Sequence, residues 1–223
     1  MNNFIFANKT KVYFGKGGVK EYLGSLLQNY GDTVMLAYGR ESAKCNGVYD
    51  EVAGILRAQG KTVVDFSGIM PNPTYAKVQE GAKLAREKHV DLILAVGGGS
   101  VSDCCKVIAA QAKLSQDIWD MEVVKHTYPT EFIPLGTIMT VFGTGSEMNN
   151  GAVITHEPKK QKAGIWAAQA DFAFLDPMYT MSVPHDQLIS GAFDTLSHAM
   201  ETYFGKPDEN NLSDEMNEAI MRS

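Results

Sequence analysis

A glycine-rich turn follows a strongly apolar stretch in the middle of the chain. Residues 91–96 read Asp-Leu-Ile-Leu-Ala-Val and run directly into Gly97, Gly98 and Gly99, after which residues 100–111 have helical character. Glycines let a backbone approach a phosphate closely, and a helix N-terminus presents free N–H groups and the positive end of its dipole. A plain tight turn is the alternative, but three consecutive glycines after a buried strand favour phosphate binding. Ser100 and Asp103 have the spacing of a capping pair at the start of that helix.

A second run of glycines and small hydroxyl residues follows the strand that we predict at residues 132–138. It reads Thr-Val-Phe-Gly-Thr-Gly-Ser-Glu over residues 140–147. Such residues at a strand end suit the sugar or base of a nucleotide, although turns in general are rich in them. Two such runs at strand ends of one sheet together favour a nucleotide site over two unrelated turns.

Asp194 and His198 lie four residues apart in a helix-like stretch. At that spacing the two side chains project from one face of a helix, one turn apart. A carboxylate and an imidazole so placed can hold one divalent cation, as the two histidines of a His-Glu-x-x-His helix do. A surface ion pair and a buried histidine capped by a carboxylate are the alternatives. His185 and Glu201 are nearby polar groups, and the position of His185 directly after Pro184 favours a cap or surface role.

The elements that position these residues alternate between strand and helix. Apolar, β-branched runs predict strands at 11–14, 33–38, 61–66, 91–96 and 132–138, and helical periodicity predicts helices at 19–27, 49–58, 74–88 and 100–111. This alternation predicts a parallel sheet with helices on both faces and a ligand crevice at the carboxyl ends of the strands.

The character of the chain changes near residue 183. From Pro184 onward it reads as helical only, with a second helical stretch that begins near Asn211. We therefore predict two domains, an α/β domain at residues 1–183 and the beginning of a helical domain at residues 184–223. The last helical stretch ends at residues 217–223 without a cap or stop signal, so we expect the chain to be part of a longer protein.

Composition excludes several classes of function. The 223 residues include 20 basic and 26 acidic side chains, for a net charge of −6, which argues against nucleic-acid binding and against recognition of anionic membranes. No apolar run approaches the roughly 20 residues of a membrane helix, and residues 1–6 do not read as a signal peptide. The three cysteines, with Cys104 adjacent to Cys105, do not form a disulfide framework, so we expect a cytoplasmic, reduced protein.

Taken together in their order along the chain, these motifs resemble those of the iron-containing (group III) alcohol dehydrogenases. The resemblance rests on Gly-Gly-Gly-Ser-x-x-Asp at 97–103, Gly-Thr-Gly-Ser-Glu at 143–147 and Gly-x-x-Asp-x-x-x-His at 191–198. Segments 10–17, 46–50, 71–73 and 175–177 also fit, and the butanol dehydrogenase and aldehyde reductase branch is the most similar. Residues 139–142 read Met-Thr-Val-Phe, where many relatives have Pro-Thr-Thr-Ala.

The resemblance implies a Rossmann-like α/β domain that binds NAD(P), followed by an all-helical metal-binding domain, the architecture of dehydroquinate synthase-like proteins. It implies one divalent ion, iron or zinc, held by Asp194 and His198 together with two later histidines that this chain does not contain. The implied reaction is hydride transfer between the nicotinamide and a small alcohol or aldehyde, whose oxygen the metal polarises. A glycerol dehydrogenase-like enzyme of the same fold and a cofactor-binding fragment without catalysis are the alternatives. A homodimer is the default assembly.

The end of the second strand indicates which cofactor is preferred. NAD-preferring relatives carry an acidic residue there, which accepts a hydrogen bond from the ribose 2′-hydroxyl and repels a 2′-phosphate. In this chain the position reads Tyr38-Gly39-Arg40, where Gly39 leaves room and Arg40 could pair with a phosphate, so we expect NADP(H) to be preferred over NAD(H).

Lys162 lies in a polar stretch at residues 159–164 and resembles a family lysine near the nicotinamide. Lys160 is the competing alignment, and a charged loop that faces solvent is the alternative. The residues that we expect to contact the cofactor are therefore Gly39, Arg40, Gly97, Gly98, Gly99, Ser100, Asp103, Thr140, Thr144, Ser146 and Lys162.

Overall fold

A parallel sheet forms the centre of the protein, as a computed structural model shows for residues 7–40, 42–205 and 211–223. Its six strands lie in the order β1-β8-β5-β4-β2-β3. In that order their bounds are Lys11–Phe14, Phe172–Leu175, Leu135–Met139, Leu92–Gly97, Thr33–Tyr38 and Thr62–Phe66. Every pairing in this sheet is parallel, which confirms the predicted α/β class. Residues 1–6, on which the argument against a signal peptide rests, lie outside the described residues.

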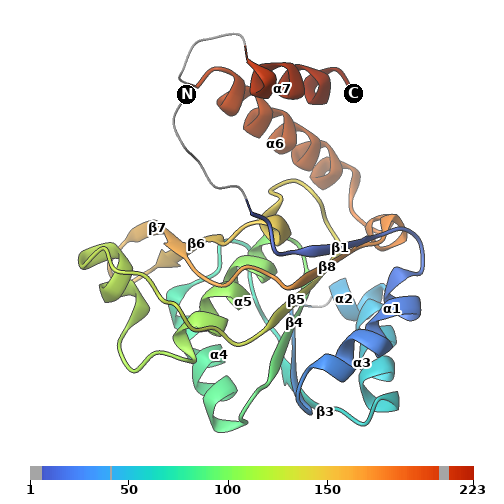
Figure 1. Ribbon diagram of the computed structural model, residues 1–223, viewed down its shortest axis with the longest axis vertical. Coiled ribbons are helices and arrows are strands. Elements are labelled where there is room, and N and C mark those ends of the chain that lie inside the picture. The colour runs from blue at the N-terminus through green and yellow to red at the C-terminus, as the bar shows by residue number, and fades with distance from the viewer. Residues whose placement is uncertain (1–6, 41, 206–210) are drawn as a thin grey trace.

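Helices cover both faces of the sheet (Figure 1). Their bounds are Gly18–Leu26 for α1, Ser42–Cys45 for the short α2, Val48–Ala58 for α3, Tyr75–Glu87 for α4 and Gly99–Gln111 for α5. Because successive side chains of a strand point to opposite faces, Leu36 and Leu94 belong to the core under α1 and α3, whereas Met35 and Ile93 belong to the core under α4 and α5. Burial on both faces explains the continuous apolar sequence of β4.

The predicted strands and helices of this region are all present, with ends within three residues of those expected. The start of α4 shows why its sequence signal is strong. Thr74 caps the helix by accepting a hydrogen bond from the backbone N–H of Lys77 at 3.3 Å, directly after the bend at residues 71–72.

An antiparallel hairpin, β6 (Gly151–His156) and β7 (Gln161–Trp166), is the main element that the sequence analysis did not predict. A charged loop at residues 159–164 was the alternative role for this stretch, and the structure corrects it, because residues 161–164 belong to β7. A tertiary contact anchors this strand: the backbone N–H of Trp166 donates to Glu122 Oε2 at 2.6 Å. Burial raises the pKa of the Glu122 carboxyl to about 7.

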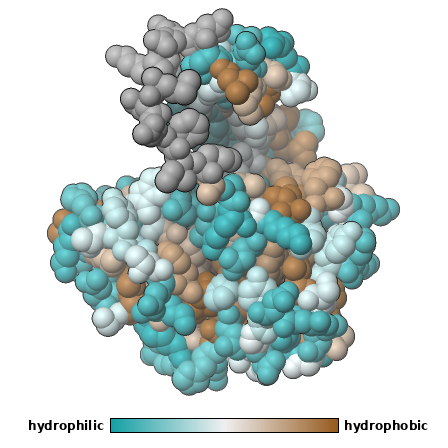
Figure 2. Space-filling view, in the orientation of Figure 1, coloured by the Kyte–Doolittle hydropathy of each residue, from teal (hydrophilic) through white to brown (hydrophobic). Residues whose placement is uncertain are grey.

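Two helices, α6 (His185–Tyr203) and α7 (Leu212–Arg222), pack together beside the sheet at one end of the molecule (Figure 1). A reciprocal capping box between Asn211 and Asp214 starts α7, at the position expected from the sequence. Figure 2 shows apolar side chains on the surface of this pair. The exposed apolar residues of α6, α7 and the segment after α6 include Phe193, Phe204 and Leu212. The domain division at residue 183 stays a prediction. Across the residues that the structure describes, we find no helix with the length and apolar character needed to cross a membrane.

Candidate functional site

A cavity of about 910 Å³ lies at the carboxyl ends of the central strands. Gly39 follows β2, Gly98 follows β4 and Val141 follows β5, and all three line the cavity. Another part of its wall comes from the first half of α6, including Gly191 and Asp194. The cavity therefore occupies the place where ligands bind in open α/β sheets, between the sheet and α6.

The glycine turn is shaped by close contacts that a side chain would break. A Cβ on Gly97 would lie 2.5 Å from Val101 Cγ2, and a Cβ on Gly99 would lie 2.4 Å from Thr144 Oγ1. Gly98 is the N-cap of α5 and has no side chain that could compete for the first N–H groups of the helix. Gly98, Gly99 and Ser100 line the cavity, so the N-terminus of α5 lies at its wall, and a helix N-terminus at a cavity is an arrangement that can bind a phosphate.

The predicted capping pair of Ser100 and Asp103 is wrong. No side chain caps α5, and the Asp103 carboxylate turns away to accept hydrogen bonds from Ser146 Oγ at 2.5 Å and from the backbone N–H of Val153 at 2.9 Å. Asp103 binds these tertiary partners and does not cap the helix, because α5 begins at Gly99 and Asp103 therefore lies beyond its first turn.

The residues expected at the cofactor fall into two groups. Those that line the cavity are Gly39, Arg40, Gly98, Gly99, Ser100 and Thr144. Those that do not line it are Gly97, Asp103, Thr140, Ser146 and Lys162.

The second group supports the walls of the cavity instead. The Thr140 N–H donates to the Gly97 carbonyl at 3.0 Å and so joins the ends of β4 and β5. Lys162 donates from Nζ to Asn72 Oδ1 at 2.9 Å, which holds β7 next to the Pro71 wall. The roles of these side chains toward a cofactor stay predictions.

Sequence reasoning missed several lining residues. Cys45 and Asn46 line the cavity beside Gly39, and Ile69 and Met70 come from the segment after β3. The only available signal was the family-like stretch at residues 46–50, which includes Asn46. Cys45 reaches the cavity from the end of α2, and Ile69 and Met70 reach it from the segment after β3, none of which carries a local pattern.

The Asp–His pair lies on α6, and the loop after β5 contacts it. A Cβ on Gly191 would lie 2.5 Å from the carbonyl oxygen of Phe142, so glycine allows the helix to approach this loop. The approach places the Asp194 carboxylate at the cavity wall.

The geometry of this pair fits two ligands of one cation. Asp194 Oδ2 lies 3.8 Å from His198 Nε2, and the side chains are 45% and 56% exposed. Two ligands at ordinary zinc or iron distances in a tetrahedron lie about 3.4 Å apart, so a small side-chain adjustment lets both reach one ion. Oxygen and imidazole nitrogen suit divalent iron and zinc. Among the described residues, no group of three or more His, Cys, Asp or Glu side chains is placed to hold a metal.

A parallel sheet with a cavity at the carboxyl ends of its strands defines a Rossmann-like α/β protein. A family model described as iron-containing alcohol dehydrogenase matches residues 9–177. The chain is 42% identical over 226 residues to the probable NADH-dependent butanol dehydrogenase 1 of Bacillus subtilis, and the match covers 100% of this chain and 58% of that protein. It is 38% identical to the NADPH-dependent aldehyde reductase YqhD of Escherichia coli, with 99% of this chain and 57% of that protein covered.

A solved structure agrees with these matches. NADH-dependent butanol dehydrogenase A of Thermotoga maritima superimposes with a TM-score of 0.92 at 37% identity, covering 100% of this chain and 56% of that one. The chain belongs to the iron-containing alcohol dehydrogenase family, as its motifs predicted. It spans little more than half the length of the curated relatives that it matches. Membership implies an NAD(P)H cofactor and a divalent metal.

Proposed function

We propose that this protein is an oxidoreductase that transfers hydride between NAD(P)H and a small alcohol or aldehyde with the help of one divalent metal. The observation that carries the proposal is the meeting of the glycine turn and Asp194 at one cavity. The relatives named as butanol dehydrogenases and an aldehyde reductase support this substrate class. The free cysteines fit a reduced cytoplasmic location, and a homodimer stays a prediction.

Each part of the cavity has a separate task in this proposal. The N-terminus of α5 at Gly98, Gly99 and Ser100 would hold the pyrophosphate, because its N–H groups and dipole attract anions. Asp194 and His198 would supply two ligands to the metal. When bound, the nicotinamide supplies the hydride and the metal polarises the substrate oxygen.

A preference for NADP(H) over NAD(H) is part of the proposal. Gly39 and Arg40 line the cavity after β2, so a glycine stands where NAD-preferring relatives have a carboxylate, and a guanidinium follows it. Relatives with 37–42% identity include both NADH-dependent and NADPH-dependent enzymes, so the family alone does not decide the preference.

A chain that binds cofactor without catalysis is the second candidate. The described residues offer two metal ligands and no third. Turnover by these 223 residues would then need ligands from elsewhere.

We expect dinucleotide to protect Cys45 from alkylation. Cys45 is exposed and lines the cavity, whereas burial raises the pKa of Cys104 to about 12 and that of Cys105 well above its ordinary value. Iodoacetamide should therefore modify Cys45 first. At a dinucleotide concentration ten times the Kd, mass action slows the reaction about tenfold, as measured by intact-protein mass spectrometry. The Cys45→Ser variant controls for slow labelling of the buried thiols, and an unchanged Cys45 rate at saturating dinucleotide contradicts the placement of the cofactor.

Aldehyde reduction tests the proposed reaction itself. The purified chain is assayed by loss of reduced-nicotinamide absorbance, with NADPH and NADH in parallel and with or without added iron(II) or zinc. Metal-dependent oxidation of the cofactor is the expected result, because a metal held by Asp194 and His198 would supply the Lewis acid that polarises the substrate carbonyl. If the cofactor protects Cys45 but no turnover occurs, the result supports a chain that binds cofactor without catalysis. Turnover that does not change when metal or a chelator is added contradicts the metal-dependent oxidoreductase.

A further inference from the structure

A buried lysine lies on α5, two turns after the glycine turn. The Lys106 side chain is 0% exposed, although lysine is among the residues that are almost never fully buried without partners. It lies seven residues after Gly99, on the helix whose N-terminus lines the cavity. The proposed reaction gives this cation no task, so its position needs another explanation.

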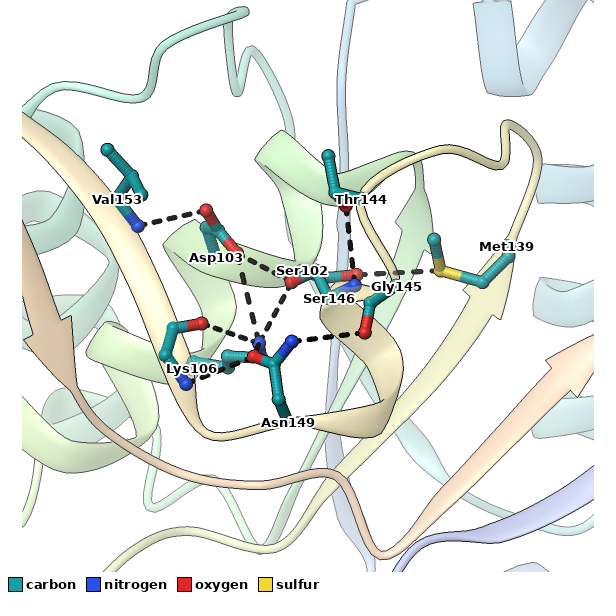
Figure 3. Close-up of polar contacts among 10 residues, drawn as sticks. Ser102, Asp103, Lys106, Met139, Thr144, Gly145, Ser146, Asn149 and Val153 are labelled. Atoms are coloured by element: carbon teal, nitrogen blue, oxygen red, sulfur yellow. Dashed lines mark hydrogen bonds and ion pairs between the residues drawn. The ribbon is translucent and has the colours of Figure 1, made fainter. Parts of the chain in front are cut away.

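The three hydrogen-bond acceptors of Lys106 belong to one segment, residues 143–151, which we call the 143–151 loop. Lys106 Nζ donates to Ser146 Oγ at 2.9 Å, to Asn149 Oδ1 at 3.0 Å and to the Gly151 carbonyl at 2.7 Å (Figure 3). An ammonium has three N–H bonds and no acceptor. The three acceptors therefore use the full donor capacity of a charged lysine.

Asp103, one turn before Lys106 on α5, binds the 143–151 loop and the residue that follows it closely in β6. Its carboxylate accepts from Ser146 Oγ and from the Val153 N–H, and it lies 3.8 Å from Lys106 Nζ (Figure 3). Ser146 therefore accepts from Lys106 and donates to Asp103. The loop is tied to α5 by a connected polar network in which the charges are paired.

The network fixes the loop where it closes over the helix N-terminus. The Ser146 N–H donates to Thr144 Oγ1 at 3.3 Å, and that oxygen would lie 2.4 Å from a Cβ on Gly99. Thr144 and Gly99 both line the cavity. A shift of Ser146 away from Lys106 would move Thr144 off the glycine turn.

We propose that Lys106 is a positioning residue of the dinucleotide site, which as a charged donor holds the 143–151 loop on α5 so that Thr144 covers the phosphate-binding turn. The inference rests on the proposed function. Lys106 does not line the cavity and acts only through the loop. Lys106 orders the loop before the dinucleotide binds. Without it, the loop would occupy the competent position only part of the time, and the apparent Kd would equal the intrinsic Kd divided by that fraction.

The protonation of Lys106 gives this role a pH signature. Burial lowers its pKa to about 8, while the nearby Asp103 carboxylate on α5 and Glu147 in the 143–151 loop oppose that shift. Above about pH 8 the neutral amine has two N–H bonds for three acceptors, so dinucleotide affinity is expected to fall.

Global stability should respond in the opposite direction. In unfolded chains a lysine with a pKa near 10.5 keeps its proton between about pH 8 and 10.5, where the folded lysine has lost it. The unfolded state then binds more protons, so this group raises the free energy of unfolding as pH increases through that window. Opposite pH trends for affinity and stability separate a positioning role from a purely structural one.

The test uses Lys106→Met in the full chain. We expect the Kd for NADPH to rise about tenfold, which corresponds to a loop that occupies the competent position about a tenth of the time. We also expect amide hydrogen exchange without cofactor to become faster across residues 143–153. The matched control is Lys113→Met, just beyond the end of α5, where the lysine is exposed and both measurements should match wild type. Loss of the wild-type decline in affinity above pH 8 is the third expected result.

A second variant separates the loop from the helix. Asn149→Ala removes one acceptor of Lys106, so the double variant Lys106→Met/Asn149→Ala should lose less affinity than the two single losses added together. Wild-type loop exchange and Kd in Lys106→Met overturn the inference, as does faster exchange spread evenly through the sheet. Failure of the wild-type chain to bind either NADPH or NADH would overturn the proposed function instead. This outcome is distinguishable because the wild-type Kd is measured before any variant is compared.

Discussion

Replacing His198 with alanine is expected to abolish metal-dependent aldehyde reduction while leaving dinucleotide affinity within about twofold of wild type. Groups that merely orient a metal ligand contribute about 10–100-fold, so loss of a direct ligand should cost more than about 100-fold. The imidazole lies 3.8 Å from the Asp194 carboxylate and is more than half exposed, so its removal opens no cavity. His198 does not line the cavity where the pyrophosphate is expected, and cofactor binding should therefore persist.

The same helix offers a control for this substitution. His185 begins α6, its side chain is 83% exposed, and its charged neighbour is Asp186 at 4.0 Å. His185→Ala should keep wild-type metal content and turnover. Bound iron or zinc is measured by inductively coupled plasma mass spectrometry, alongside oxidation of NADPH. Full metal content and full turnover in His198→Ala would show that His198 is not a ligand.

The sheet could be predicted because its strands carry their own signal. β4 is buried on both faces, so its sequence is apolar without interruption, and the glycines after it mark its end. The hairpin was missed for the opposite reason. β7 is largely exposed, and its lysine-rich surroundings have the composition of a solvated loop. Its position depends on Trp166 reaching Glu122, a contact across 44 residues that no local pattern records.

The candidate site shows the same division between local and tertiary signals. The spacing of Asp194 and His198 placed both side chains on one helical face, since helical periodicity is local. The spacing of Ser100 and Asp103 suggested a local cap, but Asp103 instead binds Ser146, 43 residues further along the chain. Lys106 carries no sequence signal at all, because a lysine on a helix is normally read as solvated. Only the fold brings three acceptors to its ammonium.

A carboxylate at position 39 is expected to reverse the cofactor preference. A Cβ on Gly39 would meet the Ile69 carbonyl at 3.5 Å, an ordinary contact, and Gly39 does not have a positive φ, so Gly39→Asp is compatible with the backbone. The new carboxylate would repel a 2′-phosphate and accept a hydrogen bond from a 2′-hydroxyl. We expect NADPH affinity to fall about 100-fold, equivalent to about 2.7 kcal/mol, while NADH affinity is kept or improved. Equilibrium titration of nucleotide fluorescence measures both.

Arg40→Ala separates the two contributions to this preference. Loss of the guanidinium removes attraction without adding repulsion, so NADPH should weaken about tenfold, the scale of one charge-assisted hydrogen bond, and NADH should not change. Equal weakening of both nucleotides by Gly39→Asp would indicate damage to the cavity and not discrimination of the 2′-group. Tighter binding of NADH than NADPH by wild type would contradict the role given to Arg40. Because related enzymes include NADH-dependent and NADPH-dependent ones, family membership does not predict the preference, and these two substitutions test the proposed role of Gly39 and Arg40 directly.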